Sequence, residues 1–161
     1  MKATGIVRRI DDLGRVVVPK EIRRTLRIKE SDPLEIFTDR DGKIILKKYS
    51  PIGELGDFAK EYAQSLAQVS GYTVCIADHD QIIAASGKRA KEYAGRLIDE
   101  ELETVILNRK TVKLAKKEAV RLTQNDAGGY QSQVISVITS LGDCVGAVII
   151  FSENGETELG E

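Results

Sequence analysis

Histidine, cysteine and tryptophan are scarce in this sequence of 161 residues, which contains one histidine, two cysteines and no tryptophan. One histidine and two widely separated cysteines do not provide the ligand spacing of a usual zinc site, so we expect no bound metal. Cys75 and Cys144 each lie in an apolar run, where a thiol packs like a small hydrophobic side chain. We therefore predict two buried free thiols in preference to a disulfide or a redox pair.

Long apolar runs and enzyme signatures are also missing. No stretch approaches the roughly 18 to 20 consecutive apolar residues of a membrane span, and residues 1–15 contain no apolar signal core. A cytoplasmic protein that does not bind membranes is therefore expected. There is no phosphate-binding loop or dinucleotide fingerprint, and no nucleophile has a recognisable base and orienting group. His79 lies between two aspartates and is interpreted as an exposed turn residue, so we predict no enzymatic activity and no cofactor.

The charge of the chain is balanced overall, at a formal net charge of −1, but it is unevenly divided. Residues 1–50 carry 13 Lys and Arg against 8 Asp and Glu, whereas residues 51–161 carry 11 against 17. A basic half beside an acidic half indicates that the basic half meets a polyanion. Ser50-Pro51, followed by Gly53, favours a break in regular structure. We predict two domains, residues 1–50 and residues 51–161.

The first half has the pattern of a strand, a turn, a strand, a short helix and a hairpin. Strands are expected over residues 4–10 and 15–18, joined by a turn in which Gly14 suits a positive φ. A short helix is expected over residues 20–28, and the alternation in residues 33–49 predicts a hairpin. Fifty residues without a disulfide or metal seldom fold alone, yet this half is rich in Ile, Leu and Val. We therefore predict an obligate homodimer in which two copies share one core.

The run G-x-V-R-R-I-D-x-L-G-R-V-V-x-P-K-E-I-R-R-x-L over residues 5–26 resembles the DNA-binding domain of the AbrB transition-state regulators. The resemblance implies a swapped-hairpin β-barrel, made by two interleaved chains, that presents arginines to double-stranded DNA. By position these are Arg8, Arg15, Arg23 and Arg24. Adjacent strand residues face opposite sides, and of Arg8 and Arg9 the resemblance selects Arg8. Each arginine alone is explained as well by solvated surface charge, but the basic cluster favours DNA contact.

The second half begins with a helix, predicted from apolar residues at helical spacing between Leu55 and Leu66. This helix is followed by two strands around the Asp78–Asp80 turn and by a helix within residues 96–107. Short strands are then expected at 111–115 and 119–123, and strong strands at 132–139 and 144–151. A helix on an antiparallel sheet is an α+β fold. Residues 50–63 and 146–152 are similar to the GAF-like domain of sporulation regulators in the AbrB family, which implies a sensor or oligomerisation domain with flanking helices.

These observations predict an α+β protein with a dimeric swapped-hairpin AbrB-type barrel followed by a GAF-like antiparallel-sheet domain. The resemblance implies a sequence-tolerant transcription regulator, activator and repressor of late sporulation genes, that binds DNA as a dimer or tetramer. Such binding relies on phosphates and DNA shape. An unknown small-molecule effector is left open. The alternative is an antitoxin-like DNA-binding protein that neutralises a partner toxin. The pattern of apolar residues in the second half, which predicts a core of its own, argues against this alternative.

Overall fold

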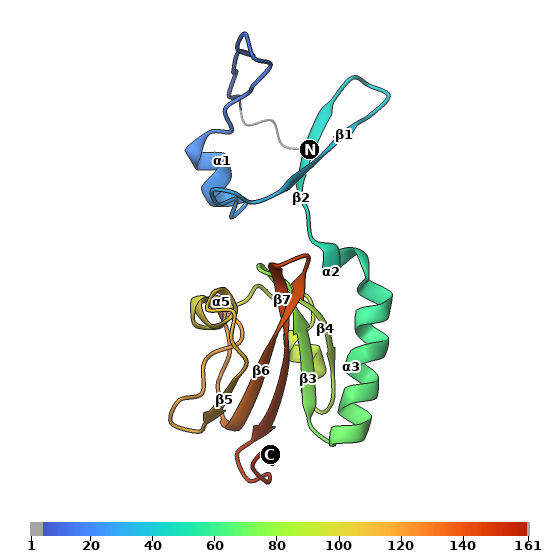
Figure 1. Ribbon diagram of the computed structural model, residues 1–161, viewed down its shortest axis with the longest axis vertical. Coiled ribbons are helices and arrows are strands. Elements are labelled where there is room, and N and C mark those ends of the chain that lie inside the picture. The colour runs from blue at the N-terminus through green and yellow to red at the C-terminus, as the bar shows by residue number, and fades with distance from the viewer. Residues whose placement is uncertain (1–4, 161) are drawn as a thin grey trace. The chain divides into compact units, whose positions relative to one another are not determined.

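A computed structural model describes residues 5–160 and divides into two compact units, the first ending at Tyr49 and the second beginning at Ser50 (Figure 1). The first unit contains α1 (Lys20–Thr25) and an antiparallel hairpin of β1 (Leu34–Thr38) and β2 (Ile44–Lys48). The short helix and the hairpin expected from the sequence are therefore confirmed.

The two strands expected at the start of the first unit are not formed within the single chain. Residues 5–10 and 15–18 belong to no sheet of the described chain, and residue 4 lies outside the described residues. The turn between them forms as predicted: Gly14 has φ 76° and its N–H donates to the Asp11 carbonyl at 3.1 Å. A strand is stable only when a neighbour satisfies its main-chain groups, and no described segment of the same chain pairs with these residues.

The apolar side chains of the first unit are largely exposed. Val7 and Val17 are 85% and 73% exposed, and Ile36 and Ile44 are 66% and 70% exposed. Among residues 5–49 only Pro19 is buried. The first unit therefore has almost no core of its own, although it has the apolar residues to form one.

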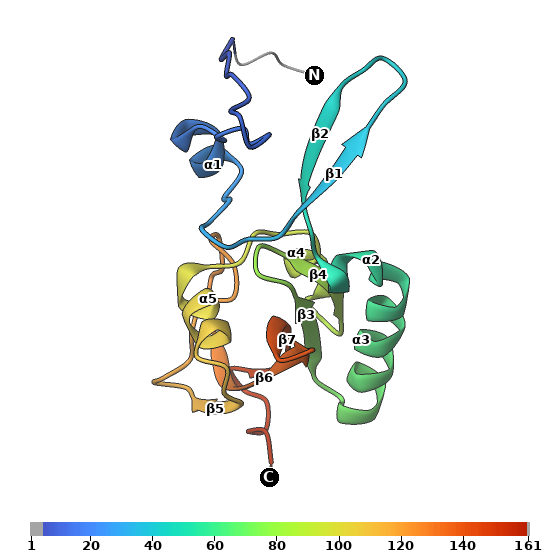
Figure 2. The same ribbon diagram turned by 45° about the horizontal axis from the view of Figure 1, so that its top comes forward.

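The second unit is a five-stranded antiparallel sheet in the order β4-β3-β7-β6-β5 with helices on both faces (Figure 2). Its strands are β3 (Thr73–Ala77), β4 (Ile82–Ser86), β5 (Val112–Ala115), β6 (Tyr130–Ser140) and β7 (Asp143–Glu153). Its helices are α2 (Pro51–Glu54), α3 (Gly56–Ser70), α4 (Ala90–Tyr93) and α5 (Glu100–Leu107). This confirms the α+β fold expected for the GAF-like half. The strand expected over residues 119–123 is absent there, where Thr123 makes an isolated bridge to Ile98.

The sheet separates two apolar cores. The larger core includes the rings of Tyr93, Tyr130 and Phe151. The smaller core lies under α3, whose Ala59 and Ala63 pack on β3 and β4. The sequence predicted one apolar face on this helix, but the structure divides it. The alanines face the sheet, and the larger residues are exposed to solvent: Leu55, Phe58, Tyr62, Leu66 and Val69.

Both cysteines are free and buried, as predicted. Cys75 lies in β3, where burial raises the pKa of its thiol to about 12. The thiolate is the reactive form, so native protein at neutral pH is expected to react negligibly with a thiol-specific disulfide reagent. The same reagent should titrate both thiols after denaturation. Rapid reaction of either thiol in the native protein, read by absorbance of the released thiolate, would contradict this packing.

Candidate nucleic-acid interface

The four predicted DNA-binding arginines all lie in the first unit and are all exposed. Arg8 lies before the first turn, Arg15 ends that turn, and Arg23 and Arg24 occupy the last turn of α1. Arg15 alone of the four forms an ion pair with a described residue, Asp11. The structure of one chain therefore offers several guanidinium groups to solvent, and whether they meet DNA stays a prediction.

Arg15 is held by the turn that precedes it. The Asp11 Oδ1 atom accepts the N–H groups of Leu13 at 3.0 Å and Arg15 at 2.7 Å, and Oδ2 accepts the Arg15 Nε–H at 2.7 Å. The hydrogen bonds from Arg15, main chain first and then side chain, lower the pKa of Asp11 below its ordinary 3.8. A lowered pKa in the folded state stabilises the turn above that value, and the effect is lost as pH falls through the folded pKa. At neutral pH the carboxylate orients the guanidinium through Nε.

A second turn repeats the same pattern. Asp39 Oδ1 accepts the N–H groups of Asp41 at 3.0 Å and Lys43 at 2.9 Å, and Gly42 has φ 76°. Asp-x-x-Gly followed by a basic residue therefore occurs at 11–15 and at 39–43, a repeat that sequence reasoning missed. The two basic residues differ, because the Lys43 ammonium contacts both Asp39, at 3.2 Å, and Asp41, at 2.7 Å. Lys43 is thus less available to a polyanion than Arg15 is.

Arg23 and Arg24 are positioned by the way in which α1 ends. The N–H of Ile28 donates to the Arg23 carbonyl at 2.7 Å, and Arg27 takes φ 52°. This is a Schellman ending with arginine in the position that glycine usually occupies. Lys48 of β2 donates to the Arg27 carbonyl at 2.9 Å and pairs with Asp32 at 3.2 Å, which joins the helix end to the hairpin.

The Asp78-His79-Asp80 turn of the second unit has a structural role. Asp78 is buried, and its carboxylate accepts a hydrogen bond from the Ser50 hydroxyl at 2.8 Å and main-chain N–H groups of the turn. His79 is half-buried, with Nε2 at 2.7 Å from the Cys144 carbonyl oxygen. The expectation of an exposed histidine is therefore wrong, because the turn packs against the start of β7. Asp99 is buried and caps the start of α5, where its carboxylate accepts the N–H of Glu101 at 3.1 Å.

Residues 5–160 contain neither a cluster of metal-ligating side chains nor a helix suited to span a membrane. No group of three or more His, Cys, Asp and Glu side chains in that range is arranged to hold a metal ion. No helix described in that range is long and apolar enough to cross a bilayer.

Comparison with known proteins identifies relatives of both units. The family described as "Stage V sporulation protein T C-terminal, transcription factor" matches residues 54–161, and "Antidote-toxin recognition MazE, bacterial antitoxin" matches residues 7–54. Stage V sporulation protein T of Bacillus subtilis (strain 168) is 55% identical over an alignment of 161 positions, which covers 98% of this chain and 90% of that protein.

The first unit also matches a shorter regulator. Transition state regulatory protein AbrB of Bacillus subtilis (strain 168) is 69% identical over 51 residues, covering 32% of this chain and 52% of AbrB. A solution structure of the AbrB N-domain is 67% identical, with a TM-score of 0.29, over 32% of this chain and 96% of that one. The resemblance seen in residues 5–26 is confirmed by the sequence identities to stage V sporulation protein T and to AbrB. The chain belongs to the family of stage V sporulation protein T, a family of transcription factors, and its N-terminal half is of the AbrB type.

Proposed function

We propose that this protein is a sequence-tolerant DNA-binding regulator that acts in the cytoplasm, activating some late sporulation genes and repressing others. The observation that carries the proposal is the set of four exposed arginines: Arg8, Arg15, Arg23 and Arg24. They lie in a unit whose relative in AbrB is described as an N-terminal DNA recognition domain. Residues 1–50 form the DNA-binding domain in this proposal, and residues 51–161 form the sensor or oligomerisation domain.

The mechanism follows from the chemistry of the guanidinium group. Arginine presents several N–H donors in a planar fork that matches a phosphate or the edge of a guanine. Contacts to phosphate oxygens carry little sequence information, so binding depends on backbone charge and on the deformability of the duplex. Sequence tolerance is the expected consequence.

Dimerisation is proposed from the exposed apolar residues of the first unit. Val7 and Val17 lie in the two unpaired segments, and Ile36 and Ile44 lie on the hairpin. Exposing so much apolar surface to water is unfavourable, since burial of apolar surface stabilises a fold by roughly 25 cal/mol per Å². A second copy that supplies the missing strand partners would cover these residues and satisfy the main-chain groups of residues 5–10 and 15–18. Two copies also double the number of arginines presented to one duplex.

A further association is proposed through α3. Its exposed residues Phe58, Tyr62 and Val69 are spaced by about one or two helical turns on the side away from the sheet. Apolar residues at such spacing are typical of helices that pair with another helix. Pairing of α3 with its copy in a second dimer would give a tetramer.

The antitoxin alternative is favoured by the family match over residues 7–54. Antitoxins of this kind usually bind their toxin through a short disordered tail. Here the corresponding part of the chain is a five-stranded sheet with two packed cores. Transcription regulation is therefore the better supported function.

Fluorescence anisotropy with two labelled duplexes tests the proposed function. One duplex is an AT-rich promoter fragment, and the other has the same length and an unrelated sequence. Sequence-tolerant binding predicts dissociation constants that agree within about 10-fold, far less than the usual ratio of roughly 10³ or more for sequence-specific regulators. Absence of binding to both duplexes at low salt would contradict the proposal.

A further inference from the structure

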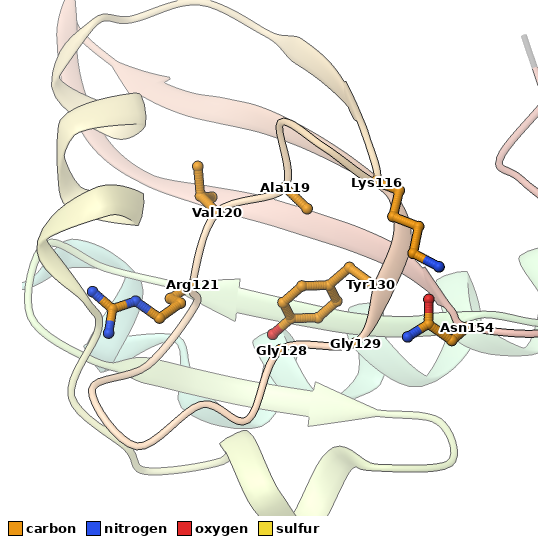
Figure 3. Close-up of a pocket in the computed structure, with 8 residues that line it drawn as sticks. All are labelled: Lys116, Ala119, Val120, Arg121, Gly128, Gly129, Tyr130 and Asn154. Carbon is orange, nitrogen blue, oxygen red and sulfur yellow. The ribbon is translucent and has the colours of Figure 1, made fainter.

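A pocket of about 200 Å³ opens on the second unit at the start of β6 (Figure 3). Its walls come from three segments far apart in the sequence: residues 116–121 after β5, residues 128–130, and Asn154 after β7. Sites for drug-sized ligands have volumes of roughly 300–1,000 Å³. The size of this pocket therefore suits a molecule of few heavy atoms.

The floor of the pocket is the ring of Tyr130, which is fixed by its neighbours. Tyr130 is 4% exposed, and its ring packs edge-on against Phe151 with the centroids 4.9 Å apart. Its hydroxyl already donates to the Asp126 carboxylate and lies 3.1 Å from the hydroxyl of Tyr93. Burial raises the pKa of Tyr130, so this side chain stays neutral. The Tyr130 ring therefore contributes an uncharged aromatic surface to the pocket.

The rim formed by Gly128 and Gly129 is also held in place. The Gly128 N–H donates to Asp126 Oδ1 at 2.8 Å, and its carbonyl accepts from Arg89 at 3.4 Å. The Gly129 carbonyl accepts the main-chain N–H of Asn154 at 2.9 Å. Both glycines have positive φ, 70° and 91°. The pocket is thus formed before a ligand arrives, which lowers the entropic cost of binding.

The polar side chains that line the pocket lie at its two ends and differ in whether they have partners. Lys116 and Asn154 lie next to each other at one end, as Figure 3 shows. Neither side chain makes an ion pair or hydrogen bond with another residue of the described range 5–160. Arg121, at the other end, is turned away and pairs with Glu101 at 3.4 Å. No acidic side chain is among the described residues that line the pocket. One unpaired ammonium and one amide therefore lie at one end of a pocket that is also lined by Ala119, Val120 and the tyrosine ring.

We propose that this pocket binds a small aliphatic monocarboxylate. The carboxylate accepts hydrogen bonds from the Lys116 ammonium and the Asn154 amide, because an ionised acceptor suits both donors. The short apolar body lies against Val120 and the ring of Tyr130. This site lies entirely in the second unit, so the proposal goes beyond DNA binding and does not rest on it.

Calorimetry and amide NMR on the full chain test the proposal, with straight-chain acids from acetate to hexanoate as probes. Butyramide is the neutral analogue, and inorganic phosphate is the generic anion. Lys116→Met keeps the aliphatic stem and removes the charge. Lys117→Met is the matched control, since Lys117 is the adjacent exposed lysine and does not line the pocket.

Saturable binding of at least one acid is expected, with amide shifts confined to residues 112–130 and 150–156. Lys116→Met should weaken it by about 10-fold or more, the size of one charged hydrogen bond, while Lys117→Met changes it by less than about twofold. Butyramide and phosphate should bind much more weakly than the best acid. No saturable binding, equal loss in the two lysine variants, or phosphate and butyramide binding as tightly as the acid would each overturn the proposal. None of these results depends on DNA, so each is separable from failure of the proposed function.

Discussion

Substituting Arg15 and Arg24 together by alanine is expected to weaken the binding of duplex DNA by roughly 1,000-fold. Each dimer would lose four contacts, and about 1 kcal/mol for each hydrogen bond to an exposed phosphate amounts to about 4 kcal/mol. Both side chains are exposed and neither belongs to a core, so the fold should persist. Anisotropy titration at constant salt measures the affinity, and circular dichroism verifies the fold.

The matched control for this prediction is the double substitution Arg9→Ala and Arg40→Ala. It removes the same charge from the first unit, and both residues are exposed and lie outside the predicted set. A general loss of positive potential should weaken binding by less than about 10-fold. Equal effects of the two double variants would mean that net charge, and not the predicted arginines, determines binding.

Substituting Val17 by aspartate is expected to abolish the folded state of the first unit. Val17 is 73% exposed in the single chain, but the proposed dimer buries it in the shared core. Burying an unpaired carboxylate costs several kcal/mol, and a symmetric dimer contains the substitution twice. Hydrogen exchange should show loss of protection in residues 5–49 and retention of protection in the sheet of the second unit, together with loss of DNA binding.

Leu141→Asp is the control for the substitution at Val17. Leu141 is a fully exposed apolar residue at the β6–β7 turn, with φ 51°, a conformation that aspartate tolerates better than leucine. This change should leave dimerisation, hydrogen exchange in residues 5–49 and DNA binding unaltered. A folded, DNA-binding Val17→Asp variant would show that the exposed apolar residues of the first unit are not an interface.

Local patterns were sufficient to predict much of this fold. The hairpin around Asp39–Gly42, the α3 helix and the strong strands β6 and β7 follow from the period of apolar residues and from turn chemistry. The strands expected over residues 4–10 and 15–18 have the right composition, but a ladder depends on a partner that the single chain does not supply. The helical spacing of apolar residues also did not show which of them in α3 face the sheet, because Ala59 and Phe58 are equally compatible with an apolar helix face.

The candidate sites differ in how far the sequence reveals them. The arginines of the first unit lie within a short, recognisable run, and the role of Asp11 in orienting Arg15 follows from the Asp-x-x-Gly-Arg turn. The repeat of that turn at residues 39–43 was present in the sequence and was overlooked. The pocket gave no sequence signal, because Lys116, Tyr130 and Asn154 meet through the pairing of β5, β6 and β7.

The salt dependence of DNA affinity tests the central claim most directly. The dissociation constant of the 161-residue chain for one duplex would be measured between about 50 and 200 mM salt, a range over which counterion release changes the affinity strongly. Eight arginines in a dimer, each neutralising one phosphate, predict that the logarithm of the association constant, the reciprocal of the dissociation constant, falls with the logarithm of salt concentration at a slope of roughly −7. The Arg15→Ala/Arg24→Ala variant should lose about half of this slope. A slope near zero for the wild-type protein, or the same slope in the variant, would contradict binding through these arginines.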